Sequence, residues 1–297
     1  GVNLYSLAKQ TSIPLIGWRN RGGLPMGLVL YHNSQAVGSN LALGKKWQHS
    51  HDTHLRVWVQ LGIRRAALVW GNHTVQTFEQ NPNWASTDGY RSRLQNAGLG
   101  YDVTLPSQTV LHFNPVPHGS AVSLIKRYRL DSITDPNGNQ IQYLYDGLSR
   151  LIRVEDSTGR ALIFNYGVTQ LDSVAFTTPG GYSRIWTFIY DNVNRLVRIN
   201  LPTVTTNAGP QNYDVEVGYD ANTNVISMAD PEGMLWTFGY NGNRIAFEQW
   251  PANTAAERVL YQSSANLRMV TDPRGNQTTY EYDGLSRLIR RRDASFF

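Results

Sequence analysis

Three histidines and an aspartate stand close together in the run His49-Ser50-His51-Asp52-Thr53-His54. Imidazole and carboxylate groups are common zinc ligands, and two histidines two residues apart share one face of a strand. This set, with His32 as a further donor, is large enough for a metal site. The alternative is that the imidazoles bond to the backbone at a solvent-exposed strand edge. We favour the alternative and predict no metal and no cofactor, with His49, His51 and His54 as the residues that a zinc titration would test.

Carboxylates are the other groups that could do chemistry, and they recur in register along the second half of the chain. A residue that every copy of a pattern contains is explained by the fold, because an aspartate at the start of a turn bonds to its own backbone. The sequence contains no Gly-x-Ser-x-Gly, no phosphate-binding loop and no His-Glu-x-x-His, and it has 0 cysteines. We therefore predict no catalytic residues and no enzyme.

A stretch of nine residues occurs twice, as Tyr145–Arg153 and as Tyr282–Arg290. Over the wider windows 134–153 and 271–290, 16 of 20 positions are identical. Self-similarity at such a period is typical of a repeat protein. The units are marked by Tyr-Asp-x-x-x-Arg, which comprises Tyr145, Asp146, Gly147, Arg150, Tyr166, Tyr190, Asp191, Arg195, Tyr219, Asp220, Tyr240, Tyr261, Tyr282, Asp283, Gly284 and Arg287.

A second motif, Asp-Pro-x-Gly, stands between these tyrosines. Asp, Pro and Gly at the first, second and fourth positions favour a type I turn, and alternating residues such as Ile141 and Tyr143 indicate strands on either side. Each unit is therefore predicted to be a β-hairpin. The turn residues are Asp135, Pro136, Gly138, Asp230, Pro231, Gly233, Asp272, Pro273 and Gly275.

Tyrosines one unit apart should form a row along one face of the sheet. As structure, the row packs against its neighbours, and Arg150, Arg195 and Arg287 stack on a tyrosine of the next unit. As function, an exposed aromatic row would stack sugars or bases. We favour the structural interpretation.

These tandem units, over roughly residues 130–292, resemble the RHS or YD-repeat family. The resemblance implies a ribbon of antiparallel hairpins that curves and spirals into a hollow shell, in secreted bacterial proteins that deliver toxins and in related animal cell-surface proteins. The predicted fold class is all-β with tandem hairpin repeats. A β-propeller is the alternative, because units near 42 residues would make four-stranded blades.

The net charge of +5 is concentrated in the first part of the chain. Residues 1–125 hold 10 Lys or Arg against 4 Asp or Glu, while residues 126–297 hold 17 against 18. The excess is scattered, so we predict a solvated surface and no nucleic-acid partner. No run of residues is apolar for long enough to predict a membrane span.

All seven histidines precede residue 125, and the repeat markers follow it. We therefore predict a β-rich N-terminal cap over residues 1–125 and an array of about seven hairpins over residues 126–297, which ends mid-repeat. The N-terminal cap also resembles the segment that commonly precedes such repeats, through Gly23-Leu24-Pro25 and Gly44-Lys45-Lys46-Trp47.

The predicted function is that of a non-enzymatic structural segment of a YD-repeat shell, which encloses or presents a C-terminal cargo or toxin in the full polypeptide. Its partner is then the remainder of its own chain, and its location is secreted or at the cell surface, in a bacterium. The alternative is a surface module that binds carbohydrate or protein through the aromatic row and the irregular loops at 177–181 and 201–210.

Overall fold

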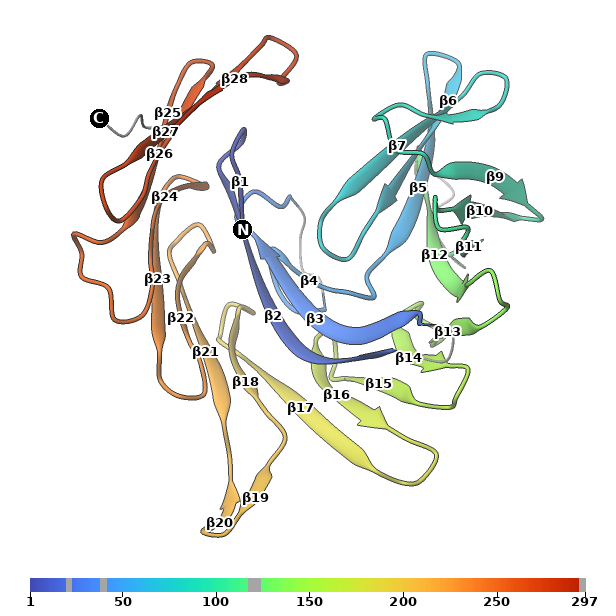
Figure 1. Cartoon of the computed structure of the whole chain (residues 1–297). Helices are drawn as coiled ribbons and strands as arrows, with labels where there is room; N and C mark the ends of the chain where they lie inside the picture. Colours follow the sequence, from blue (N-terminus) through green and yellow to red (C-terminus); the bar gives the residue numbers. More distant parts are fainter. Residues whose placement is uncertain (20–22, 38–41, 117–123, 294–297) are drawn as a thin grey trace. The chain divides into compact units, whose positions relative to one another are not determined.

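A computed structural model of the chain describes residues 1–19, 23–37, 42–116 and 124–293. Every regular element in these ranges is a β-strand, and each strand pair with a defined register is antiparallel (Figure 1). The predicted all-β class, with tandem antiparallel hairpins, is therefore confirmed.

The described chain forms two compact units. Unit 1 comprises Gly1–Ser12, His32–Trp47 and Trp186–Phe297, and unit 2 comprises Ile13–Tyr31 and Gln48–Ile185. Boundaries between them fall within four strands: β2 (Ala8–Arg19), β3 (Pro25–Asn33), β4 (Trp47–His49) and β17 (Ser183–Tyr190). Each unit thus combines residues of the predicted N-terminal cap with residues of the predicted repeats. The division of the sequence at residue 125 stays a prediction.

Unit 2 contains the strands from β5 to β16. They are β5 (His54–Gln60), β6 (Ile63–Val69), β7 (Val75–Gln80), β8 (Trp84–Ser86), β9 (Arg93–Ala97), β10 (Gly100–Thr104), β11 (Val110–Pro115), β12 (Ile125–Thr134), β13 (Gln140–Tyr145), β14 (Leu151–Asp156), β15 (Ala161–Tyr166) and β16 (Leu171–Thr177). Strand β12 branches the sheet: it pairs with β11 along one edge, while the other edge pairs with β5 at residues 125–129 and with β13 at residues 132–134. The strands before residue 125 thus continue directly into the repeat strands.

Unit 1 contains β1 (Val2–Asn3) and the later repeats. These are β18 (Leu196–Asn200), β19 (Val204–Thr206), β20 (Gly209–Gln211), β21 (Asp214–Tyr219), β22 (Val225–Ala229), β23 (Leu235–Asn241), β24 (Arg244–Gln249), β25 (Val259–Ser264), β26 (Leu267–Thr271), β27 (Gln277–Tyr282) and β28 (Leu288–Arg292). Strands β21 to β28 pair in chain order without a break. This order is that of a continuous hairpin ribbon and does not contain the separate four-stranded sheets of a propeller.

The alternation that predicted the strands also fixes which face is buried. In β13, Ile141 and Tyr143 are buried, whereas Gln140, Gln142 and Leu144 are exposed. A period of two places alternate side chains on opposite faces of a strand, so the apolar set forms a core on one face. The aromatic side of the ribbon is therefore its packed side.

The longest irregular insertion projects from the end of a hairpin. Residues 204–211 form a small two-stranded sheet, β19 with β20, in which Val204 pairs with Gln211. Nearly all side chains of residues 203–213 are exposed. The insertion therefore adds surface and leaves the pairing of β18 with β21 intact.

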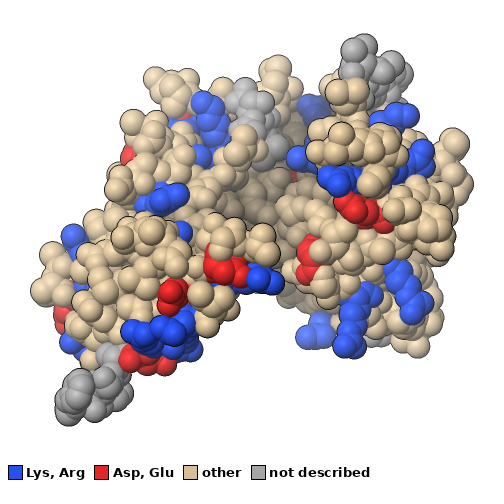
Figure 2. Space-filling model, turned by 90° about the horizontal axis from the view of Figure 1, so that it is seen from above, with Lys and Arg blue, Asp and Glu red and all other residues tan. Residues whose placement is uncertain are grey.

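Charged side chains are dispersed over the face shown in Figure 2, where basic and acidic groups stand beside one another. Several face each other in ion pairs, such as Arg198 with Glu216 at 2.6 Å. Over the described ranges, no helix has the length and apolar character needed to cross a membrane.

Candidate functional site

The repeated aspartates each form a turn between two paired strands, and this turn occurs at eight positions among the described repeats. Oδ1 of Asp146 accepts hydrogen bonds from the backbone N–H groups of Leu148 and Arg150, each at 2.9 Å. The Ser149 N–H donates to the Asp146 carbonyl, and the Asp146 N–H donates to the Arg150 carbonyl. The same arrangement occurs at Asp135, Asp156, Asp191, Asp220, Asp230, Asp272 and Asp283.

The two sequence motifs, Tyr-Asp-x-x-x-Arg and Asp-Pro-x-Gly, therefore fold into one turn. The residue three positions after the aspartate has a positive φ in both: 81° at Gly138 and 62° at Ser149. The next residue closes the turn onto Oδ2, either through an arginine, as Arg150 does at 2.8 Å, or through an asparagine, as Asn139 does at 2.8 Å. The proline or glycine at the second position differs between motifs without changing the turn.

The turn hydrogen bonds stabilise the charged form of the aspartates. The side-chain amide of Asn139 and neighbouring N–H groups lower the pKa of Asp135, and the backbone N–H of Arg287 does the same for Asp283. The carboxylates of Asp135 and Asp283 are thus held in their charged form by the turns that they close.

The hydroxyls of three tyrosines in the series connect a hairpin to the one before it. The Tyr145 hydroxyl donates to the Leu130 carbonyl at 2.6 Å, and that of Tyr240 donates to Val225 at 3.0 Å. The acceptor Val225 lies six residues after Tyr219, the preceding tyrosine of the series. Burial raises the pKa of Tyr145, Tyr166, Tyr219, Tyr240 and Tyr261, so these hydroxyls stay protonated as donors.

Arginines cover the ring faces of four tyrosines in the series: Tyr145, Tyr166, Tyr219 and Tyr282. The Arg150 guanidinium lies 4.8 Å from the ring centroid of Tyr166, one unit on, and Arg195 lies 5.3 Å from that of Tyr219. No tyrosine of the series is exposed, and Tyr282 is only 7% exposed. A sugar-stacking site would need open ring faces, which this row does not offer.

In unit 1, the N-terminal residues pack on the tyrosine side of the repeats. The Trp47 indole donates to the Tyr219 hydroxyl at 2.7 Å, and the ring centroids of Tyr5 and Tyr282 are 5.1 Å apart. Lys9 and Glu248 form an ion pair of 2.8 Å with side chains only 8% and 10% exposed. The fold therefore uses residues of the N-terminal segment to cover the aromatic face of later hairpins.

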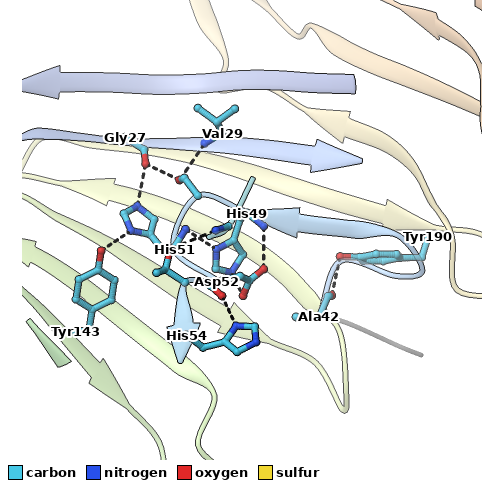
Figure 3. A network of polar contacts seen from close by, with 12 residues as sticks. Gly27, Val29, Ala42, His49, His51, Asp52, His54, Tyr143 and Tyr190 are labelled. Carbon is cyan, nitrogen blue, oxygen red and sulfur yellow. Dashed lines mark hydrogen bonds and ion pairs between the residues drawn. The ribbon is translucent and has the colours of Figure 1, made fainter. Parts of the chain in front are cut away.

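In unit 2, His51 of the histidine run also packs against a tyrosine of the repeats. Nε2 of His51 lies 2.8 Å from the Gly27 carbonyl, and its Nδ1 lies 3.2 Å from the Tyr143 hydroxyl (Figure 3). The Trp18 indole similarly donates to Asp156 at 2.9 Å. These contacts join His51 to Tyr143 in strand β13 and Trp18 to Asp156 at the end of strand β14.

The expectation of a solvent-exposed strand edge at this run is wrong, because His49, His51 and His54 are 1%, 7% and 3% exposed. Their nitrogens have partners: His49 with Asp52, and His54 with the Asp52 carbonyl at 2.8 Å. Burial lowers the pKa of all three histidines, that of His51 and that of His54 to about 3. Within the described ranges, no group of three His, Cys, Asp or Glu side chains is arranged to hold a metal ion.

Several residues that hold this arrangement carried no signal in the sequence analysis. Lys9, Trp18 and Arg268 are separated from their partners by more than a hundred residues, and no motif marks them. Arg268 is 8% exposed and donates to the Tyr5 carbonyl at 2.7 Å. The sequence signal that could have identified Arg268 is a single arginine within an otherwise uncharged strand segment, Leu267–Thr271.

A comparison with known families matches one segment of the chain, residues 266–295, to the family model described as RHS Repeat. Residues 266–295 are an RHS repeat. The segment contains Tyr282, Asp283 and Arg287, whose turn is the one found at Asp146, so the resemblance seen in the motifs is confirmed there. Because residues 134–153 are nearly identical to residues 271–290, the RHS unit recurs at the start of the repeats.

No curated protein sequence matches the chain. Solved structures with a similar trace include the crystal structure of TcdB2-TccC3-TEV (10% identity, TM-score 0.28, 95% of this chain and 23% of that one). TcdB2-TccC3 without its hypervariable C-terminal region gives 10% identity, a TM-score of 0.30 and coverages of 94% and 22%. The Tc holotoxin pore of Photorhabdus luminescens gives 11% identity and a TM-score of 0.27, with coverages of 97% of this chain and 22% of that one. The chain spans less than a quarter of the length of these chains.

Proposed function

We propose that the chain is a structural segment of an RHS shell that encloses a C-terminal cargo or toxin in a longer, secreted bacterial polypeptide. Its partner is then the remainder of its own polypeptide. The observation that carries the proposal is the use of the repeated polar residues: the aspartates close turns, and the tyrosine hydroxyls join successive hairpins. Polar residues that are engaged in turns and between hairpins stabilise the sheet, which supports a structural, non-enzymatic role.

The packing of the N-terminal residues supports the same proposal. If the aromatic face of the ribbon bound a soluble ligand, that face would have to be accessible to solvent. Here Trp47 and Tyr5 cover it in unit 1, and Trp18 and His51 cover it in unit 2. An enclosing wall needs such a covered, tightly bonded face, because gaps would admit water and proteases.

The test is limited proteolysis of the full polypeptide that contains this segment. The part that follows the repeats should resist trypsin for as long as the repeats stay folded, and should be cut when Trp18→Ala and Trp47→Ala loosen the wall. A matched control is Trp84→Ala, because the Trp84 indole donates to the Asn96 side chain of strand β9 and its ring packs on Tyr101, so it makes none of the contacts that cover the tyrosine row. Cleavage of the following part at the same rate in folded and loosened proteins would contradict enclosure.

A second candidate is a surface-binding role for the projecting hairpin of β19 and β20. Val204 and Tyr213, at the two ends of this insertion, are 49% and 38% exposed, so an aliphatic and an aromatic side chain are available to a partner there. Replacing residues 203–212 by a short Gly-Ser turn should leave the fold intact, because β18 still pairs with β21. Loss of binding to glycan arrays or to target-cell surface proteins after this replacement would support the second candidate.

A further inference from the structure

Three arginines of unit 2 lie together on two neighbouring strands. Strands β5 and β12 pair so that Arg127 stands directly opposite Arg56, and Arg129 stands opposite His54. Residues that are directly opposite in an antiparallel pair project from the same face, with Cβ atoms about 5 Å apart. Like charges at such a position destabilise the sheet, so this pair requires an explanation.

The surrounding residues do not supply one. Arg56, Arg127 and Arg129 belong to none of the ion pairs formed within the described residues. The stretches outside those ranges contain no Asp or Glu in their sequence. The nearby Asp52 carboxylate, whose Oδ2 accepts from the His49 N–H at 2.9 Å, forms no ion pair with these arginines among the described residues, and its single charge offsets only one of their three.

Neighbouring side chains hold the guanidinium groups in place. Nε of Arg56 donates to His54 Nε2 at 3.1 Å, and His54 Nδ1 is fixed by the Asp52 carbonyl at 2.8 Å. The Arg129 guanidinium lies 4.5 Å from the Tyr145 ring centroid, and its Nε is buried without a hydrogen-bond partner among the described residues. These contacts orient the Arg56 and Arg129 groups and use only part of their capacity to donate hydrogen bonds.

The site is accessible and yet surrounded by protein. Arg56 and Arg127 are exposed to solvent. Burial among neighbouring groups nonetheless lowers the pKa of Arg127, with Asp52 opposing that shift and Arg56 adding to it. Of the three arginines, Arg129 is half-buried, and its guanidinium lies over the Tyr145 ring.

We propose that Arg56, Arg127 and Arg129 form a binding site for an oxyanion, the carboxylate or phosphate group of a ligand. Arg56 and Arg127 project from the same face of two paired strands, where their planar guanidinium groups suit the paired oxygens of such a group, and the Tyr145 ring lies beside Arg129. Binding replaces the repulsion between Arg56 and Arg127 with charge-assisted hydrogen bonds. The free site is therefore the less stable state, and the anion stabilises the fold by mass action.

The first test is calorimetric titration of the protein with inorganic phosphate and, separately, with a hexaglutamate peptide, at constant ionic strength set with chloride. Saturable binding is expected for at least one probe. Saturation by phosphate alone identifies a phosphoryl ligand, and saturation by the peptide identifies acidic side chains. Absence of saturable binding for both probes overturns the proposal.

The second test uses variants. Arg127→Gln and Arg56→Gln should each raise the dissociation constant of the anion by about tenfold or more, since one charge-assisted hydrogen bond accounts for at least that factor. The control is Arg93→Gln, because Arg93 is exposed on β9 and has no carboxylate partner among the described residues. Equal affinities in the parent, Arg127→Gln and Arg93→Gln overturn the proposal.

The melting temperature in phosphate-free buffer distinguishes an anion site from arginines that only stabilise the fold. Removing one guanidinium relieves the repulsion, so Arg127→Gln should melt at the same temperature as the parent or higher, and its melting temperature should no longer rise with the anion. Arg56→Gln makes the same test from the opposite strand. A lowered melting temperature in both variants, with the anion response retained, contradicts the site.

Discussion

The indole N–H of Trp47 donates a hydrogen bond of 2.7 Å to the hydroxyl of Tyr219. That hydroxyl donates in turn to the Leu196 carbonyl at 2.5 Å, which joins two hairpins of unit 1. Trp47 is fully buried, and burial raises the pKa of Tyr219, so both donors stay in place over the physiological pH range. One tyrosine thus connects an N-terminal residue, its own hairpin and the hairpin before it.

Removing the Tyr219 hydroxyl should therefore leave two polar groups unpaired. We expect Tyr219→Phe to lower the free energy of unfolding by about 2 to 3 kcal/mol, because a buried donor without a partner loses about 1 to 3 kcal/mol. Tyr240→Phe is the matched control, since its hydroxyl donates one hydrogen bond, to Val225. Urea denaturation measures both. A Tyr219→Phe loss no larger than that of Tyr240→Phe would show that the Trp47 bond contributes nothing.

The turn geometry predicts different losses of stability when two glycines of neighbouring turns are each replaced by alanine. Gly138 has a φ of 81°, so Gly138→Ala should destabilise the protein by about 1 to 2 kcal/mol. Gly147 lies outside the positive-φ residues, and nothing lies within 4 Å of a Cβ added there. Gly147→Ala should therefore change stability by no more than about 0.5 kcal/mol, which is typical of a surface substitution. Thermal melts of the two variants compare them directly, and equal losses would refute the common turn.

The hairpins could be predicted from the sequence because their signals are local. The aspartate, the glycine and the alternation around Ile141 lie within about ten residues of one another. The identity of the two turn motifs was missed, because Ser149 occupies a left-handed conformation that is expected mainly of glycine or asparagine. Comparing the positions of Gly138 and Ser149 relative to their aspartates would have revealed it.

The packing of the N-terminal residues could not be predicted in the same way. Lys9 reaches Glu248 across 239 residues, and Trp18 reaches Asp156 across 138. Such pairs depend on how the whole ribbon folds, and no local pattern around Lys9 or Trp18 marks them. The histidine run shows the same limit, because its polar composition suggested exposure, whereas Gly27 and Tyr143 satisfy His51 in the interior.

Burial of neutral histidines predicts that acid destabilises unit 2. The pKa of His51 and that of His54 are lowered from 6.5 to about 3, so the unfolded chain binds protons that the folded chain does not. The free energy of unfolding should then fall as the pH decreases from 6.5, by up to about 1.4 kcal/mol per pH unit for each such histidine. Urea denaturation between pH 7 and pH 4.5 measures the slope. The range stays above the pKa of the turn residue Asp135, which its hydrogen bonds, led by that from the Asn139 side chain, lower from 3.8.

The same slope should decrease in His51→Gln, whose amide can still donate to the Gly27 carbonyl but does not titrate. His112→Gln is the control, because His112 is 32% exposed beside Asp102 and lies outside the buried run. An unchanged slope in His51→Gln would mean that His51 is not buried as a neutral group.

The ion pair between Lys9 and Glu248 gives the prediction with the largest effect. Both side chains are buried, and Lys9 also lies 4.7 Å from the Phe238 ring centroid, so little water reaches either charge. Lys9→Met should lower the free energy of unfolding by about 3 to 5 kcal/mol, because it leaves the Glu248 carboxylate buried and unpaired. Lys9→Met combined with Glu248→Leu should recover most of that loss, since an apolar pair of similar volume replaces two charges that are costly to desolvate. Urea denaturation of the parent, the two single variants and the double variant gives the coupling energy. Additive losses in the double variant would show that the two charges do not interact, and the N-terminal residues would then have to be held on the repeats by their apolar contacts alone.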